Sequence, residues 1–330
     1  MSMKKIFSLA VIFTMLFALP ALAASEGGMP LSGPYKDGTR ITLATGGEQG
    51  EYYAFGSALA EIVSRKTATQ VRAVASRGAM SNIEALDRNN AKIAFIQTDV
   101  GFYASRGKRL FNTKHDKFST VAVLYPEPVQ IVTLDPKITH VEHLKGKTVS
   151  VGAEGSGTYF NAVDVFKAYE MDIETDINPV YESFADAVDA LKEGKIDAAF
   201  IVAGTPTPAV SELAGTGFSI VSLDDEHIMR LIGECPYYEK IELPKSTYGT
   251  KDNDVTVAVD AVIVARDDVK MEDIYNFMYG VFENLDGLKE APRAAYLTLR
   301  KAANYPAVPY HPGAVKYLGE KGILVSGKNK

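Results

Sequence analysis

Short apolar runs alternate along the chain with segments in which apolar residues recur at helical spacing. Residues 40–44 form the first β-rich run, and Phe55, Leu59 and Ile62 then recur every three or four positions. Further strands are expected at 71–75, 92–96, 148–151 and 198–202, and further helices at 81–88, 184–192, 271–282, 292–299, after 157 and from 311. This order predicts an α/β fold with parallel sheets and helices on their faces.

Two longer β-rich runs, 121–134 and 255–265, interrupt this alternation. The chain has 330 residues, about twice the length of a typical domain, so two lobes are expected. We interpret the long runs as strands that cross between the lobes and form a hinge. The interpretation divides the chain into a discontinuous first lobe at 30–125 and 260–330 and a continuous second lobe at 126–259.

The first residues have the three-part pattern of a secretory signal peptide. Lys4 and Lys5 precede an uncharged, mostly apolar run at 6–19, and Ala21-Leu22-Ala23 then offers a small-residue cleavage site. The apolar run is shorter than the roughly 20 residues that span a bilayer. We therefore expect residues 1–23 to be removed during export and the mature protein to be periplasmic.

Charge and cysteine content narrow the classes of partner. Without Lys4 and Lys5 the chain keeps 33 basic and 41 acidic residues, a net charge of −8, and the two signs are interspersed. This balance argues against nucleic acid or an anionic membrane as the partner. Cys235 is the single cysteine, so no internal disulfide can form, and a small buried apolar residue is its ordinary role.

Three glycine-bearing turns, 45–50, 76–82 and 154–158, each lie between a predicted strand and a predicted helix. A helix start presents unpaired backbone N–H groups and the positive end of the helix dipole, which together attract anions. The hydroxyls of Ser81, Ser156 and Thr158 add donors. In open α/β sheets such turns lie at the carboxyl ends of the strands, where ligands bind. The alternative, that each glycine only permits a tight turn, stays open for any single turn.

Sequence patterns of known catalytic and cofactor sites are not matched. The glycine spacing fits neither a dinucleotide fingerprint nor a phosphate-binding loop with its lysine, and Glu154 stands where a nucleophile elbow requires glycine. His140 and His143 are three residues apart but lie in a predicted loop, a weak basis for a zinc site. We expect no enzyme activity, no cofactor and no metal, although a catalytic set assembled only in space would escape this test.

An ordered set of short motifs resembles the TAXI branch of the solute receptors of TRAP transporters. The motifs are Thr45-Gly46-Gly47 through Tyr53, Ile96-Gln97-Thr98-Asp99-Val100, Leu124-Tyr125-Pro126-Glu127-Pro128-Val129, Leu144-Lys145-Gly146-Lys147, Val151-Gly152, Gly155-Ser156-Gly157-Thr158, Gly194-Lys195-Ile196-Asp197-Ala198 and Pro309-Tyr310-His311-Pro312-Gly313-Ala314. Each motif is weak alone, but together they run from about residue 40 to 325. The resemblance implies a two-lobed, type II periplasmic-binding-protein fold that closes on its ligand.

The resemblance also implies a function and a set of cleft residues. It implies capture of a small carboxylated solute, glutamate or a related dicarboxylate, for delivery to the membrane subunits of a sodium-coupled permease, by a protein that is expected to be a monomer. Carried over position by position, it assigns residues from both lobes to the cleft. From the first lobe come Gly47 and Tyr52, together with Gln97 and Asp99 at the end of their strand, and Glu127 lies on the crossing run. The second lobe contributes Gly155, Ser156, Gly157, Thr158, Gly204 and Thr205.

Arg77 and Glu127 are the charged residues with the clearest candidate roles. Arginine can hold a carboxylate through two parallel hydrogen bonds, although an exposed surface cation is an equally good interpretation of Arg77. Glu127 lies between two prolines on a crossing run, where a helix-surface carboxylate is not expected, so it could meet a substrate ammonium or hydroxyl. Ala79 departs from the resembled family, which often has serine there, and this leaves the exact substrate open.

Two other classes of function are alternatives to transport. An enzyme on a similar fold would need a nucleophile, a metal set or a cofactor lysine in the cleft. A sensory or surface ligand-binding protein would use the same clamp to signal to a partner, and the sequence does not separate this alternative from transport.

Overall fold

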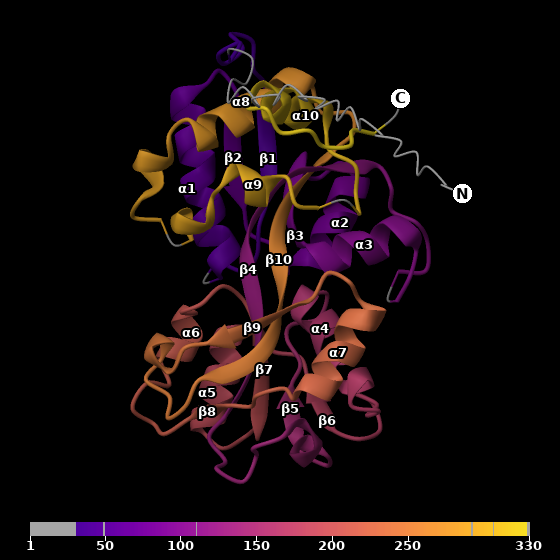
Figure 1. Cartoon of the computed structure of the whole chain (residues 1–330), viewed down its shortest axis with the longest axis vertical. Coiled ribbons are helices and arrows are strands. Elements are labelled where there is room, and N and C mark those ends of the chain that lie inside the picture. Colours follow the sequence, from indigo (N-terminus) through magenta and orange to yellow (C-terminus); the bar gives the residue numbers. More distant parts are fainter. Residues whose placement is uncertain (1–30, 49, 110, 292, 306, 329–330) are drawn as a thin grey trace, which may run out of the picture.

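The computed structural model of the chain describes residues 31–328, except 49, 110, 292 and 306; the predicted signal peptide lies outside them. Figure 1 shows two α/β lobes stacked along the long axis of the molecule, with two long strands running through both. The predicted two-lobed α/β fold is confirmed. Within the described residues, no helix combines the length and apolar character that crossing a bilayer requires.

The first lobe is built on a mixed sheet with the order β2-β1-β3-β10-β4. Strands β1 (Arg40–Ala44), β2 (Gln70–Val74) and β3 (Ile93–Gln97) are parallel, and β10 (Asp254–Arg266) is antiparallel to β3. The helices of this lobe are α1 (Glu51–Lys66), α2 (Ala79–Asp87), α3 (Thr98–Arg106), α8 (Met271–Phe282), α9 (Leu299–Ala302) and α10 (Pro312–Glu320).

The second lobe repeats this plan around a sheet with the order β4-β7-β5-β6. Its strands are β5 (Thr148–Ser150), β6 (Asn178–Val180), β7 (Ala198–Val202), β8 (Ser219–Ile220) and β9 (Glu239–Leu243). Its helices are α4 (Gly157–Ala168), α5 (Phe184–Lys192), α6 (Pro208–Ser211) and α7 (Asp225–Glu234). Side chains of Ser156, Ser183 and Asp224 cap α4, α5 and α7, which fixes where these helices begin.

Strand β4 (Phe118–Thr133) connects the two sheets. Its first part pairs with β10 and its last part, from Val129 to Thr133, pairs with β7. Both long strands are buried almost throughout, so they also form part of the core of each lobe. We propose this strand pair as the hinge, with the lobe boundaries predicted above.

Some local predictions are wrong. A helix was expected at 292–299, but the chain forms a 3-10 turn at Ala294–Tyr296 and then the short α9. Arg293 has a left-handed backbone (φ 71°), which a right-handed helix cannot contain. Asp99 was placed at the end of a strand, whereas β3 ends at Gln97 and Asp99 lies in the first turn of α3. Helices α3 and α7 were not predicted.

Candidate functional site

The starts of α2 and α4 meet where the two lobes face each other. Gly78 is the N-cap of α2 and Ser156 is the N-cap of α4. A Cβ atom added to Gly78 would lie 3.4 Å from the Ser156 Cα. The two predicted anion-binding turns, one from each lobe, are therefore in contact.

The turn before α4 can be formed only with glycine at specific positions. Gly152 and Gly155 have φ of 87° and 77°. A Cβ at Gly152 would lie 2.6 Å from the Thr158 Cβ, so the Thr158 side chain packs against this turn. Ser156 Oγ accepts a hydrogen bond from the Tyr159 N–H. The Ser156 hydroxyl therefore stabilises the start of α4, and the backbone N–H groups of the first turn of this helix can attract an anion.

Arg77 and Ser81 lie beside this contact between the lobes. They line a recess of about 130 Å³ with Met80, Glu84, Glu154 and Gly155. Ser81 Oγ donates a hydrogen bond to the Gly78 carbonyl (2.9 Å), so it also stabilises the start of α2. Arg77 is exposed, and the carboxylates of Glu84 and Glu154 share its recess.

Gln97 occupies the space in front of α4. A Cβ on Gly157 would lie 1.3 Å from Gln97 Oε1, so the first-lobe side chain lies directly on the backbone of the second lobe. Gln97 Nε2 donates to Asn161 Oδ1 of α4 (3.0 Å), and Asn161 Nδ2 donates to Asp99 Oδ2 (2.9 Å). Gln97 Oε1 and Asp99 Oδ1 are buried and have no hydrogen-bond partner among the described residues.

Glu127 is a buried carboxyl group at the hinge. Its exposed fraction is 2%, and Tyr52 OH donates a hydrogen bond to its Oε2 (2.8 Å). Tyr52 also stacks on Phe95 at a centroid distance of 4.8 Å. Burial raises the pKa of Glu127 well above its usual range, and the nearby Glu51 carboxylate adds to the effect.

Burial also raises the pKa of Asp99 to about 8, with a further contribution from the Asp164 carboxylate. At these two positions the neutral carboxyl group is therefore favoured. Because a neutral carboxyl group can both donate and accept a hydrogen bond, Glu127 and Asp99 can adapt to either kind of ligand group.

Gly204 and Thr205 lie against a buried ion pair of the first lobe. Glu51 pairs with Arg293, and the Arg293 guanidinium also donates to the carbonyls of Thr205 and of Pro206 (2.8 Å to Pro206). A Cβ on Gly204 would lie 2.8 Å from Glu51 Oε2 and closer still to Arg293. This loop of the second lobe is thus fixed to the first lobe through its backbone.

The structure brings most of the predicted residues to one interface. Tyr52 OH donates hydrogen bonds to Glu127 and to the carbonyl of Ile96 (3.4 Å), the residue before Gln97. The Gln97 side chain in turn covers the start of α4. Gly47 instead forms a tight turn in which its carbonyl accepts from the Gly50 N–H (2.7 Å), and a Cβ there would meet nothing within 4 Å.

Three residues at the interface were missed by sequence reasoning: Glu51, Asn161 and Arg293. Glu51 opens α1 and Asn161 lies in the middle of α4, positions where polar residues are common on exposed surfaces. Arg293 lies 242 residues from Glu51 in the sequence. Only the fold brings these side chains together, and no local pattern marks them.

The arrangement is suited to binding. The hydroxyl, amide and carboxyl groups at the interface come from both lobes, so a small solute between them would contact both. Among the described residues, no group of three or more His, Cys, Asp or Glu side chains is placed to hold a metal ion.

Solved structures with a similar fold have low sequence identity to the chain. A protein from Bordetella bronchiseptica RB50 matches with a TM-score of 0.50 and 17% identity, over 85% of this chain and 89% of that chain. The periplasmic aliphatic sulphonate binding protein SsuA from Escherichia coli gives 0.46 and 16%, over 87% and 79%. A TctC solute binding protein from Polaromonas gives 0.46 and 16%, over 78% and 89%. At these identities the likeness concerns the fold alone.

The family comparison covers most of the sequence. The model of the NMT1-like family matches residues 43–322, from the end of β1 to beyond α10. This range contains both lobes, the two long strands and all the interface residues described above. The chain belongs to the NMT1-like family.

Proposed function

We propose that the chain is a periplasmic solute-binding protein that holds a small carboxylated solute between its lobes. The observation that carries the proposal is the contact between the starts of α2 and α4, which places two anion-attracting helix ends from different lobes against each other. A carboxylate bound there would bridge the lobes. The solute would therefore bind the closed form more tightly than the open form and shift the equilibrium towards closure.

Residues with different chemistry are proposed to hold the two ends of the solute. The backbone N–H groups at the start of α4 and the Arg77 guanidinium would receive a carboxylate. Glu127, which lies on the proposed hinge strand β4, and its hydrogen-bond partner Tyr52 would receive a second polar group such as an ammonium, a hydroxyl or a protonated carboxyl. Glutamate and related dicarboxylates have polar groups at both ends, which fits this division.

The proposed partner is the membrane part of a TRAP transporter. This proposal rests on the motifs that resemble the TAXI branch and that follow one another in order along both lobes. Closure would present a composite surface, formed by both lobes, that the permease could recognise.

A thermal-shift screen tests the proposed solute class. Residues 24–330 would be heated with amino acids, dicarboxylates, hydroxy acids and neutral sugars. A solute at a hundred times its dissociation constant adds about 2.7 kcal/mol to the free energy of unfolding, a readily visible shift. We expect the shift with glutamate or a dicarboxylate; shifts with neutral sugars alone would contradict the proposal.

Arg77→Ala is expected to weaken binding of such a solute roughly 10- to 100-fold, because hydrogen bonds to charged groups contribute about 1.5–3 kcal/mol. Arg72→Ala is the matched control, since Arg72 is an exposed arginine of the neighbouring strand β2. Isothermal titration calorimetry measures both. Equal affinities for the two variants would remove Arg77 from the site.

A further inference from the structure

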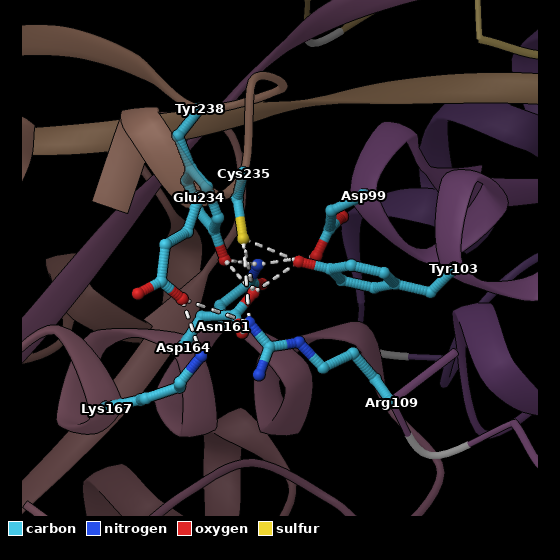
Figure 2. Close-up of polar contacts among 9 residues, drawn as sticks. All are labelled: Asp99, Tyr103, Arg109, Asn161, Asp164, Lys167, Glu234, Cys235 and Tyr238. Carbon is cyan, nitrogen blue, oxygen red and sulfur yellow. Dashed lines mark hydrogen bonds and ion pairs between the residues drawn. The ribbon is translucent and has the colours of Figure 1, made fainter. Parts of the chain in front are cut away.

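A second polar cluster joins the lobes between α3 and α4 (Figure 2). Tyr103 and Arg109 belong to the first lobe, and Asp164 and Cys235 belong to the second. Arg109 Nη2 lies 2.9 Å from Asp164 Oδ1, and Tyr103 OH donates to Asp164 Oδ2 (3.0 Å). Tyr103 OH also lies 2.7 Å from Cys235 Sγ. Both principal partners of the Asp164 carboxylate thus come from the other lobe.

Asp164 is almost completely buried in this arrangement. Its side chain is 2% exposed, whereas that of Arg109 is 25% exposed. A buried carboxylate needs a charged or hydrogen-bonding partner to offset its lost hydration. Tyr238 of its own lobe supplies only a long contact to Asp164 Oδ2 (3.4 Å). If the lobes separate, Asp164 loses Arg109 and Tyr103 together and gains water instead.

The cluster has an outer and an inner edge. On the outside, Glu234 pairs with Lys167 (2.6 Å) within the second lobe and lies 3.9 Å from Arg109. On the inside, Asn161 donates to Tyr238 OH (2.7 Å) as well as to Asp99. Figure 2 shows Tyr103 and Arg109 reaching from one side towards Asp164 and Cys235 on the other. The cluster therefore extends from the surface to the proposed solute site.

We propose that Tyr103, Arg109 and Asp164 form an inter-lobe latch that stabilises the closed form without touching the solute. The proposal rests on the proposed function, because it assumes that the two lobes open and close. The latch residues are positioning residues. They act on the solute only through the closed arrangement of Gln97, Asn161 and the start of α4.

Cys235 provides a direct reporter of the latch. It is the single cysteine of the chain and is 1% exposed, covered in part by Tyr103 of the other lobe. Burial raises the pKa of its thiol to about 11, so the closed form should react slowly with thiol reagents, which attack through the thiolate. The rate of modification under native conditions then reports how often the lobes separate.

The test compares Tyr103→Phe with Tyr275→Phe in residues 24–330 without any solute. Tyr275 also donates its hydroxyl to a carboxylate, Glu320 Oε2 (2.6 Å), but both residues lie in the first lobe. Each variant loses one hydrogen bond to a charged group, so both should unfold at lower urea concentration. Only Tyr103→Phe is expected to accelerate Cys235 modification, by roughly tenfold.

Each result supports or overturns the latch. Protection of Cys235 in the parent protein, lost in Tyr103→Phe and kept in Tyr275→Phe, supports it. Equal rates in the two variants would show that Tyr103 is merely structural. A parent protein whose thiol reacts as fast as that of a urea-unfolded sample would show that the cluster does not hold the lobes together. Because no solute is added, a wrong solute class in the proposed function leaves these outcomes unchanged.

Discussion

Glu127→Gln is expected to stabilise the protein and to weaken solute binding at the same time. Glu127 is buried and its pKa is raised mainly by loss of hydration, so its ionised form is disfavoured in the folded state. Glutamine has the same shape and cannot ionise, and it can still accept the hydrogen bond from Tyr52. We therefore expect the free energy of unfolding of Glu127→Gln to be higher than that of the parent protein at pH 8.

The stabilisation should depend on pH in a defined direction. The pKa of Glu127 is higher in the folded than in the unfolded state, so the folded parent protein is favoured while both states bind the proton. This contribution to the free energy of unfolding is lost as the pH rises above about 4.3, the pKa of a glutamate in the unfolded state. The difference between Glu127→Gln and the parent protein should therefore be small at acidic pH and grow towards pH 8, as urea denaturation can measure.

Solute binding should change in the opposite sense. If Glu127 receives an ammonium group of the solute, it ionises in the complex, and glutamine cannot supply that charge. The loss is expected to weaken binding roughly 10- to 100-fold. Asp254→Asn is the matched control: burial raises the pKa of Asp254 to about 6, and this residue begins β10 in the second lobe, next to Ser222. It should gain stability without losing affinity. Loss of stability in Glu127→Gln would contradict the description of its surroundings, and unchanged affinity would place Glu127 outside the site.

Gly157→Ala is expected to disfavour the closed form while leaving each lobe folded. The added methyl would overlap Gln97 Oε1, and Gln97 cannot move without disturbing its bond to Asn161. Overpacking of a closed interface costs about 1–3 kcal/mol, which corresponds to roughly 10- to 100-fold in solute affinity. Within its own lobe Gly157 is the first residue of α4, where alanine is readily accepted.

Two further variants separate this effect from a general loss of stability. Gly233→Ala in α7 places a methyl where nothing lies within 4 Å, so affinity should not change. In the double variant Gly157→Ala/Gln97→Ala the overlap is removed, and the added loss caused by Gly157→Ala should disappear. An additive loss in the double variant, measured by calorimetry, would show that the two residues do not meet.

The general fold could be predicted because it depends on local periodicity. The spacing of Phe55, Leu59 and Ile62 predicts the buried face of α1, and these residues are buried in the structure. Glycine turns between strands and helices likewise predict the starts of α2 and α4.

The remaining features depend on contacts between distant segments. Helix α7 is the exception, because its start is marked by a local cap in which Asp224 accepts a hydrogen bond from the His227 N–H. The predicted helix at 292–299 fails because Arg293 adopts a left-handed backbone while its side chain contacts the loop at Thr205 and Pro206. Such interactions between the lobes leave no periodic trace in the sequence.

A crystal structure of residues 24–330 with the solute that gives the largest thermal shift tests the clamp most directly. The account predicts electron density between the lobes, with a carboxylate at the start of α4 and a second polar group near Glu127 and Tyr52. Density away from the start of α4 and from Glu127, for example in the recess of about 420 Å³ lined by Lys240, Tyr296 and Lys301, would contradict it.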